Sequence, residues 1–388
     1  MTTDRLQAVV IGAGWAGEGH TRALRHAGVD VHTICARQMD IVRNVADRLG
    51  VPNASIDWRR TLEETKPDIV AVATPAVLRA EPIEMAAELG CHIFCDKPLD
   101  INAPKAKVLL DAVTRAGVKH AYAATGCYHP GVAWLAEQVA AGAVGSVREM
   151  DVVWRMPVPS SGTSPWSWMD SLALGGGPLN NAIPHLFAIV ERILDSQVTR
   201  VTGHAVPSRD RAPVVTELHD FREVWGGKPT EEELADCEWR PCDAEGSNTL
   251  LAEIQPTGSD GPPIRLTAVM GFSVLAAWPP PGFRIYGDAG TLASEGFVDP
   301  HSIRLWTDPQ GEPTVLGTPQ RLKDALPHFE DDGGAHVLGK WAALARDFVA
   351  DIEGKDHTPY LTFHDGWRYQ VAIDAVREGR AWQELPQR

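Results

Sequence analysis

The sequence predicts a two-domain α/β protein, in which a doubly wound parallel sheet is followed by an α+β domain with an open, mostly antiparallel sheet. Three observations predict this fold class. The chain has 388 residues, which corresponds to two or three domains of about 150 residues each. Short apolar runs alternate with helical periods over the first 125 residues. Beyond residue 130, longer strand-like runs replace this alternation.

The N-terminal region alternates between buried strands and helices. Continuous apolar runs such as 6–11 are typical of parallel strands that are covered on both faces. The first helix is expected to end at Gly28, a residue that favours helix ends. The predicted strands are 6–11, 29–35, 55–58, 68–73, 91–95 and 118–124, and the predicted helices are 15–27, 39–49, 78–89 and 103–116. This alternation requires a parallel sheet with helices on both faces.

The C-terminal region begins with a helix predicted at 131–141 and is then rich in strands. The predicted strands are 147–158, 199–206, 248–256, 264–273, 282–287 and 303–306, and two helices close the chain at 335–353 and 364–379. The segment 207–247 is polar, acidic and interrupted by Pro and Gly, which predicts an insertion or surface excursion. We place the domain boundary after residue 128, which gives domains 1–128 and 129–388.

Charge and composition exclude several classes of function. The chain has 36 Lys and Arg against 51 Asp and Glu, a net charge of −15 that disfavours binding to nucleic acids and to anionic membranes. No apolar run reaches the ~18 residues of a membrane span, and the first residues lack the features of a signal peptide. The six Cys are expected to be free thiols without a metal site. We therefore expect a cytoplasmic protein.

A glycine motif follows the first predicted strand and opens the first predicted helix. Gly12, Gly14 and Gly17 fit the pattern G-x-G-x-x-G in the strand–turn–helix context that this pattern requires. Gly12 permits a tight turn, Gly14 lets the backbone approach a pyrophosphate, and Gly17 allows close packing of helix and strand. The helix start, with Trp15 and Ala16, offers N–H groups to phosphates. The motif predicts that domain 1–128 is a Rossmann domain that binds a dinucleotide.

The end of the second strand indicates which nicotinamide cofactor is bound. An acidic residue there would hold the ribose hydroxyls of NAD, but the strand ends in Ala36 and Arg37. A small residue followed by Arg suits a 2′-phosphate, because guanidinium binds phosphate in bidentate fashion. We therefore favour NADP over NAD. The alternative is that Arg37 stacks on the adenine of NAD or faces solvent.

Two further segments contain residues suited to acid–base chemistry. Lys97 follows the fifth strand, and the carboxyl end of a parallel strand faces the ligand crevice. Asn181 and His185 are four residues apart, so they share one face of a helix and could address one ligand. The alternatives are a solvated surface lysine and a histidine with a purely structural role.

These motifs resemble those of the Gfo/Idh/MocA oxidoreductases, and the resemblance covers nearly the whole chain. His20 completes the family pattern G-x-G-x-x-G-x-x-H, and Thr74 with Pro75 matches the turn after the fourth strand. The remaining matches are Asp96-Lys97-Pro98, Gly126 to Pro130, Gly175 to His185 and Phe283 to Leu292. Their order and spacing together carry the resemblance.

The resemblance implies a Rossmann domain and an open sheet that often forms an oligomer interface, so a homodimer or homotetramer is expected. It also implies hydride transfer between a nicotinamide and a hydroxyl or keto carbon of a sugar, polyol or sugar derivative. Lys97 corresponds to the family's lysine near the reacting oxygen, and His185 to its acid–base histidine. These residue types suit the task, since alcohol oxidation needs a base with a pKa near 7 and a cation beside the alkoxide. Thr74, Pro75 and Lys97 are also expected to touch the cofactor.

Three departures from the family pattern affect this interpretation. The Asp that precedes the family histidine by four residues is Asn181 here. Asn can form hydrogen bonds but carries no charge, so Lys97 or Tyr128 is expected to take a more central part in proton transfer. Arg79 replaces a histidine, and we interpret it as a surface residue at a helix start rather than as a site for an anionic substrate. Ile183 replaces the glycine of the family pattern and Pro184 follows it, so the local backbone is expected to differ from that of the family.

Aromatic residues near the Gly-rich segment are candidates for the substrate wall. Aromatic faces pack on the apolar faces of sugars, although large aromatics are also common in cores. The candidate substrate contacts are Tyr128, Trp154, Trp166, Trp168, Asn181 and His185, with Asp170 and Asn180 as further hydroxyl contacts.

Two other functions stay open. One is altered chemistry, either imine or double-bond reduction or redox-assisted glycoside cleavage with tightly held NAD. The other is a non-catalytic dinucleotide sensor.

Overall fold

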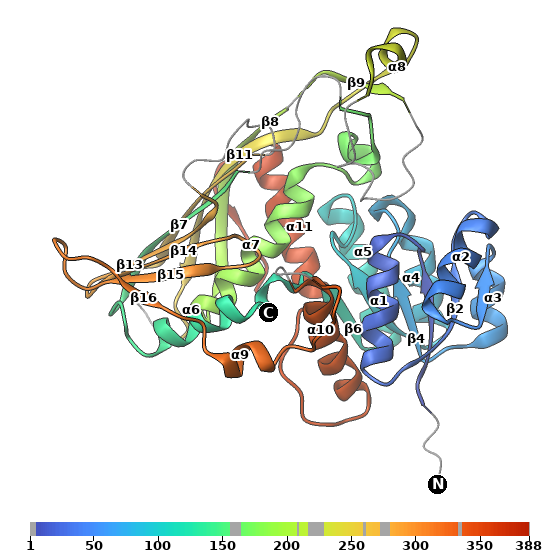
Figure 1. Cartoon of the computed structure of the whole chain (residues 1–388), viewed down its shortest axis with the longest axis horizontal. Coiled ribbons are helices and arrows are strands. Elements are labelled where there is room, and N and C mark those ends of the chain that lie inside the picture. The colour runs from blue at the N-terminus through green and yellow to red at the C-terminus, as the bar shows by residue number, and fades with distance from the viewer. Residues whose placement is uncertain are drawn as a thin grey trace. The chain divides into compact units, whose positions relative to one another are not determined.

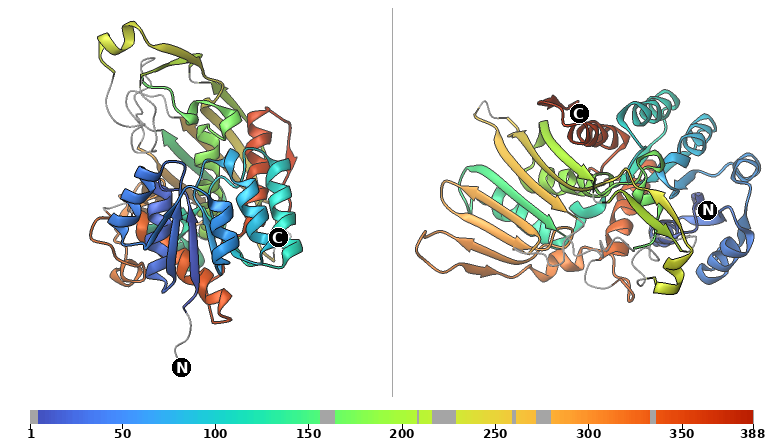
Figure 2. Two further views of the ribbon diagram at one scale, coloured as in Figure 1. Left: turned by 90° about the vertical axis from the view of Figure 1, so that its right-hand side faces the viewer. Right: turned by 90° about the horizontal axis from the view of Figure 1, so that it is seen from above.

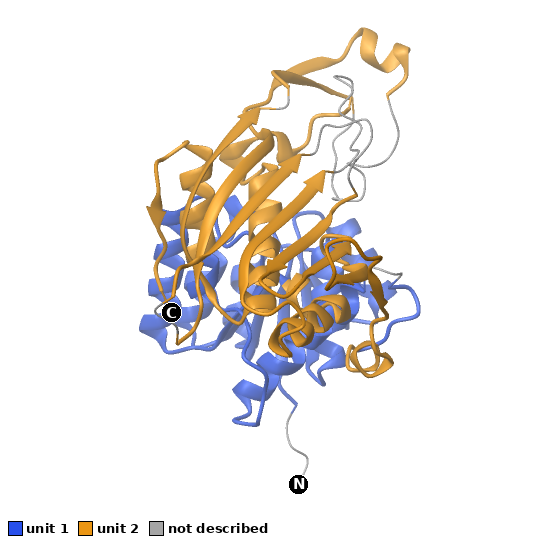
Figure 3. Cartoon of the chain, turned by 90° about the vertical axis from the view of Figure 1, so that its left-hand side faces the viewer, with its two compact units in different colours: residues 1–124, 219–223, 327–367 blue, residues 125–218, 224–326, 368–388 orange. Residues whose placement is uncertain are grey.

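The computed structural model describes residues 5–155, 164–207, 209–215, 229–258, 261–271, 280–332 and 336–387. The chain forms two compact units, which Figure 3 colours separately. Unit 1 consists mainly of Met1–Ala124 and Pro327–Trp367, whereas unit 2 contains most of the chain between them and the residues from Arg368 onward. The segment 327–367 therefore belongs to the first compact unit. The predicted boundary after residue 128 stays a prediction.

Unit 1 contains the predicted parallel sheet. Its six strands lie in the order β3-β2-β1-β4-β5-β6, and every neighbouring pair is parallel. The strands are β1 (Gln7–Ile11), β2 (Asp30–Cys35), β3 (Asn53–Ser55), β4 (Ile69–Val72), β5 (His92–Asp96) and β6 (His120–Ala123). Val9 and Val70 are fully buried, as expected for strands covered on both faces. The strand order reverses between β1 and β4, which is where ligands bind in such sheets.

Two groups of helices cover this sheet (Figures 1 and 2). Helix α1 (Trp15–His26) packs against α2 (Met39–Leu49) and α10 (Val337–Ile352), whereas α4 (Ala80–Glu88) packs against α3 (Trp58–Thr65) and α5 (Ala103–Ala116). A short 3₁₀ turn, η1 (Ala76–Leu78), precedes α4. The doubly wound arrangement predicted from the alternation of elements is confirmed.

Helix α3 is the element of unit 1 that the sequence prediction missed. We expected a strand at 55–58, but β3 ends at Ser55 and α3 begins at Trp58. The side chain of Asp57 accepts a hydrogen bond from the backbone N–H of Arg60 at 3.1 Å. This cap satisfies a helix N–H group that otherwise lacks an acceptor, so the chain turns into a helix where the strand was expected to continue.

Unit 2 is built on a nine-stranded sheet with the order β16-β15-β14-β13-β7-β12-β11-β8-β17. Among the described strands of this sheet, only β7 and β12 pair in parallel, so the predicted mostly antiparallel sheet is confirmed. The strands are β7 (Val147–Arg155), β8 (Gln197–Pro207), β11 (Glu245–Gln255), β12 (Ile264–Gly271), β13 (Gly282–Gly287), β14 (Thr291–Glu295), β15 (His301–Trp306), β16 (Thr314–Leu316) and β17 (Gln383–Glu384). Strands β16 and β17 were not predicted, and the predicted ends 156–158 and 272–273 lie outside the described residues. Strand β14 pairs with β13 as the second strand of the hairpin that the resemblance implies around 283–292.

Helices cover one face of this sheet. Helix α7 (Pro178–Leu194) packs on β8 and β11 and against α6 (Pro130–Ala140), which in turn contacts α9 (Gln320–Asp324). Along β11, buried residues such as Leu250 and Ala252 alternate with exposed ones such as Leu251. One face of the sheet is therefore buried and the other is open in the single chain. Among the described residues, no helix is long and apolar enough to cross a membrane.

The core of unit 2 contains a buried ion pair. Arg368, on helix α11 (Phe363–Arg377), is fully buried and donates to Glu191 Oε1 at 3.2 Å and to the carbonyl of Val198 at 2.9 Å. Tyr369 donates its hydroxyl to Glu191 Oε2 at 2.9 Å. These bonds join α11, α7 and β8, and they are strong because they are charge-assisted and screened from water.

The predicted excursion 207–247 carries regular structure where it is described. Strands β9 (Arg211–Val214) and β10 (Glu238–Pro241) form an antiparallel pair, and a capping box starts the short helix α8 (Glu231–Ala235). Residues 216–228 lie outside the described part of the chain.

Candidate active site

The glycine turn between β1 and α1 has the backbone that the motif requires. Gly12 has a φ of +121°, and a Cβ there would lie 2.6 Å from the carbonyl oxygen of Ala73. A Cβ on Gly17 would lie 1.9 Å from the carbonyl oxygen of Gly12. Both positions therefore exclude side chains, Gly12 because of its φ and the closeness of β4, and Gly17 because of the closeness of helix and turn.

The start of α1 suits a phosphate. Gly14 is the N-cap residue in an extended conformation and provides no side-chain cap, and Trp15 and Ala16 form the first helical turn. The hydroxyl of Thr74, in the turn after β4, is buried without a hydrogen-bond partner in the structure. An uncapped helix start beside a glycine turn and an unsatisfied hydroxyl fits the diphosphate of a dinucleotide.

Ala36 and Arg37 follow β2 directly, at the same edge of the sheet. The N–H of Gly12 donates to the carbonyl of Cys35 at 2.8 Å, so the end of β2 lies beside the glycine turn. Arg37 is exposed, and the described residues show no ion pair for it. Its guanidinium is therefore available to a ligand at this edge.

Lys97 follows β5, and Thr74 with Pro75 follows β4, so the structure brings these segments to neighbouring strand ends. Burial lowers the pKa of Lys97, Asp96 opposes this effect, and Arg79 adds to it. A lysine whose pKa is lowered has a larger neutral fraction near neutral pH and can accept a proton.

Arg79 corrects the expectation of a surface residue, because only 3% of it is exposed. Its Nε donates to the carbonyl of Thr74 at 2.9 Å and its Nη2 to that of Lys97 at 3.3 Å. Its Nη1 donates to the carbonyls of Asp96 and Pro98. The guanidinium is thus occupied by backbone oxygens, which also excludes the alternative of a site for an anionic substrate.

His20 completes the glycine motif as a buried core residue. Its ring packs edge-on against Phe94 at 4.8 Å and Trp341 at 5.4 Å between ring centroids. Burial lowers the pKa of His20 to about 4, although its Nε2 lies 3.8 Å from Asp96 Oδ1. The ring is therefore neutral at pH 7.

In unit 2, α7 carries Asn181 and His185 on one face, as predicted. Between Pro178 and Val190, only these two residues keep partial exposure, and the helix continues through Pro184. The N–H of Gly126 donates to His185 Nδ1 at 3.3 Å, so the neutral ring carries its proton on Nε2. Tyr128 ends the 3₁₀ turn η2 (Thr125–Tyr128), which contains Gly126 and packs on α7.

Residues far away in the sequence hold the start of α7. Glu245 Oε1 accepts the N–H of Leu179 at 2.9 Å, and Arg377 donates to both Glu245 oxygens at 3.1 Å. The sequence analysis missed both residues, since no local pattern links positions 66 and 132 residues apart.

Asn180 and Asp170 were expected as contacts for substrate hydroxyls, but their side chains bond to other groups of unit 2. Asn180 is 2% exposed and donates to the carbonyls of Gly175 and Gly176. Asp170 pairs with Arg209 at 2.7 Å. Both side chains therefore hold loops of unit 2, which corrects that expectation.

The three tryptophans occupy different surroundings in unit 2. Trp154 is 9% exposed and stacks on Phe297 with 4.1 Å between ring centroids. Trp166 donates its Nε1 to the carbonyl of Pro241 at 3.2 Å, and Trp168 begins the 3₁₀ turn η3 (Trp168–Asp170). Their role as a substrate wall stays a prediction.

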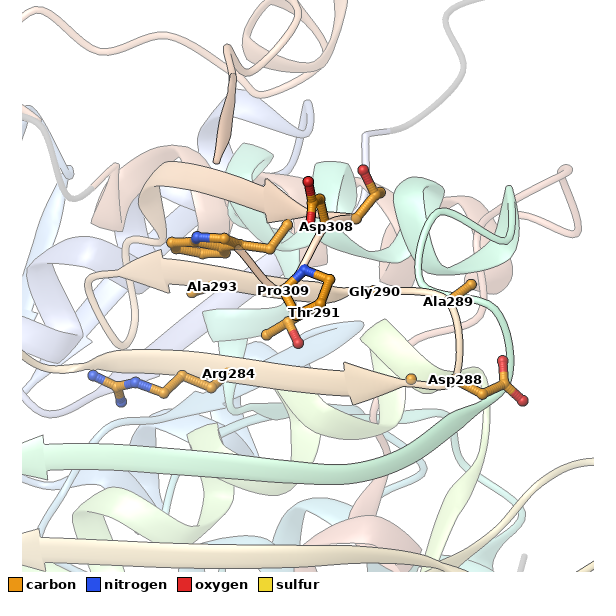
Figure 4. Close-up of a pocket in the computed structure, with 11 residues that line it drawn as sticks. Arg284, Asp288, Ala289, Gly290, Thr291, Ala293, Asp308 and Pro309 are labelled. Atoms are coloured by element: carbon orange, nitrogen blue, oxygen red, sulfur yellow. The ribbon is translucent and has the colours of Figure 1, made fainter. Parts of the chain in front are cut away.

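An open pocket lies elsewhere in unit 2, on the β13–β14 hairpin and the end of β15 (Figure 4). Arg284, Asp288, Thr291 and Asp308 are among its lining residues. None of the predicted site residues lines it. The described residues also contain no group of three His, Cys, Asp or Glu side chains that could hold a metal ion.

Two family profiles match the chain in order. Residues 6–123 match the oxidoreductase family with an NAD-binding Rossmann fold, and residues 132–229 match the GFO/IDH/MocA C-terminal domain. The two profiles correspond to the parallel sheet with its glycine turn and to the first part of the second sheet.

Curated relatives include two sugar dehydrogenases. The chain is 27% identical over 220 residues to levoglucosan dehydrogenase of Pseudarthrobacter phenanthrenivorans, covering 53% of this chain and 56% of that protein. It is 29% identical over 211 residues to D-glucoside 3-dehydrogenase of Escherichia coli, covering 53% and 59%. The matched region thus spans little more than half the length of these relatives.

Solved structures extend the similarity of fold to the whole chain. A structure of levoglucosan dehydrogenase in complex with NADH superposes with a TM-score of 0.78 at 20% identity, covering 99% of this chain and 100% of that chain. At this identity the likeness shows a shared fold.

Proposed function

Because the chain belongs to the Gfo/Idh/MocA family of oxidoreductases, with an NAD(P)-binding Rossmann domain, we propose that it transfers hydride between NADP and a carbon bearing a hydroxyl or keto group in a sugar, polyol or sugar derivative. The observation that carries the proposal is Lys97. It follows β5 at the edge of the sheet that holds the glycine turn, and burial lowers its pKa.

The dinucleotide would be held at the carboxyl ends of four neighbouring strands. Gly12, Gly14 and Gly17, with the first turn of α1, would hold the diphosphate, and Thr74 would donate its buried hydroxyl. The bound cofactor would supply the hydride acceptor or donor. Arg37, which is exposed and follows β2, would bind the 2′-phosphate of NADP.

Lys97 and His185 would have different roles in proton transfer. Neutral Lys97 would take the hydroxyl proton during oxidation, and its ammonium form would stabilise the alkoxide that develops in reduction. His185 accepts the Gly126 N–H at Nδ1, so its Nε2 carries a proton and would act as a donor to the substrate oxygen. Asn181 lies on the same helix face and would add an uncharged hydrogen bond in place of the family carboxylate.

The substrate class follows from the relatives, which are named for levoglucosan and glucosides. Tyr128, Trp154, Trp166 and Trp168 would contribute contacts to such a substrate. The open face of the nine-stranded sheet would serve as the interface of a homodimer or homotetramer.

A cofactor titration tests the proposal. NADPH and NADH are titrated against the protein by nicotinamide fluorescence, with Arg37→Ala as the test variant and Arg43→Ala, an exposed residue of α2, as its control. We expect tighter NADPH binding that is lost only in Arg37→Ala. Equal binding of both cofactors would refute the NADP preference. Cofactor that is already present and does not exchange would favour redox-assisted cleavage with tightly held NAD.

Turnover tests the catalytic part. Levoglucosan, D-glucosides and scyllo-inositol are offered with NADP⁺ and NAD⁺ to the wild type and to Lys97→Ala. We expect turnover that Lys97→Ala abolishes while cofactor affinity is kept. Unchanged turnover would remove Lys97 from the mechanism, and the absence of turnover with every substrate would favour a dinucleotide sensor.

A further inference from the structure

Arg79 is a buried cation for which the proposed function has no use, and its guanidinium donates to four backbone carbonyls. The four carbonyls belong to two turns, Thr74 after β4 and residues 96–98 after β5. Both turns lie at the edge where the dinucleotide is proposed to bind. A planar guanidinium with five N–H groups can join two such turns, whereas an ammonium group has only three donors on a flexible stem.

The bonds of Arg79 surround the peptide groups on both sides of Lys97. Its guanidinium reaches the carbonyl before Lys97, that of Lys97 itself and the one after it. The backbone from which the lysine side chain extends is therefore held in one place. Since Arg79 Nη2 also lies 3.8 Å from Asp96 Oδ2, the Asp96 carboxylate interacts electrostatically with both Arg79 and Lys97.

We propose that Arg79 is a positioning residue, which fixes the backbone of residues 96–98 and thereby holds the amino group of Lys97 for proton transfer. This inference rests on the proposed function, in which Lys97 is the acid–base group. A merely structural role would stabilise unit 1 without affecting the chemistry of Lys97.

The charges around Lys97 predict a second effect of Arg79. In unit 1 these charges are Asp96, which raises the pKa of Lys97, and Arg79, which lowers it; His20 lies against Asp96 and is neutral. Loss of the guanidinium charge therefore raises the pKa of Lys97. Lysine in the same position keeps the charge but loses the array of donors.

Competitive acetylation measures this effect without turnover. Each protein is acetylated over a range of pH, and mass spectrometry compares the labelling midpoint of Lys97 with that of exposed Lys105 in the same chain. We expect a midpoint below that of Lys105 in the wild type. In Arg79→Gln it should rise by about half a pH unit or more. In Arg79→Lys and in the control Arg60→Gln, an exposed residue of α3, it should stay near that of the wild type.

Turnover measures positioning. In Arg79→Lys we expect kcat at saturating NADPH to fall about 10- to 100-fold, because a misplaced Lys97 reacts slowly. Wild-type kcat in Arg79→Lys, or an unshifted Lys97 midpoint in Arg79→Gln, would overturn the inference. If Arg79→Gln does not fold, as judged by circular dichroism, Arg79→Lys still tests positioning. If the wild type oxidises no sugar, the proposed function fails, and the acetylation midpoints still decide whether Arg79 acts on Lys97.

Discussion

Replacing His20 by leucine should reduce the acid sensitivity of unit 1. The ring is fully buried, its nitrogens make no hydrogen bond, and its pKa is lowered to about 4 in the folded chain, against 6.5 for an ordinary histidine. The unfolded chain therefore binds a proton at a higher pH than the folded chain. The stabilisation is complete above pH 6.5 and is lost as the pH falls toward 4, a loss of roughly 3 kcal/mol.

Hydrogen exchange of the β1 amides would measure this, because those amides report the opening of unit 1. The free energy of opening is compared between pH 7.5 and pH 4.5 for the wild type, for His20→Leu and for His204→Leu, a control that removes an exposed histidine of β8. His120, whose pKa burial also lowers to about 4, is present in all three proteins and cancels in the comparison. We expect the wild type and the control to lose about 2 kcal/mol or more relative to His20→Leu over this range. An equal pH dependence in His20→Leu would refute the reasoning.

Two further predictions concern the glycine turn and the sheet of unit 2. Gly17→Ala should weaken NADPH binding by about tenfold or more, because its Cβ would lie 1.9 Å from the Gly12 carbonyl oxygen and displace the turn. Fluorescence titration checks this against Gly317→Ala, where a Cβ meets nothing within 4 Å. Asn248→Leu should raise stability by about 1–2 kcal/mol, because both amide atoms of Asn248 are buried without a partner in the structure. Urea unfolding measures it, and a loss of stability would show that the amide binds a buried water or ligand.

The local features of the fold could be predicted from the sequence. The glycine turn, the buried parallel strands and the shared face of Asn181 and His185 were all predicted correctly. Each depends on residues close together in the chain, where glycine geometry, apolar runs and helical spacing act directly. Short edge strands such as β16 and β17 were missed, since each has only two or three residues and is stabilised by pairing with one neighbouring strand.

The surroundings of the candidate catalytic residues were decided by the tertiary structure. The sequence indicated a surface position for Arg79, but the chain path brings it to carbonyls 17–19 residues away. Glu245 and Arg377 hold the start of α7 from positions far along the chain. The sequence alone indicated candidate residues for dinucleotide binding and proton transfer. Only the tertiary structure decided which groups contact these candidate residues and lower their pKa. The reason is that a buried charge depends on the partners that packing brings within hydrogen-bond distance.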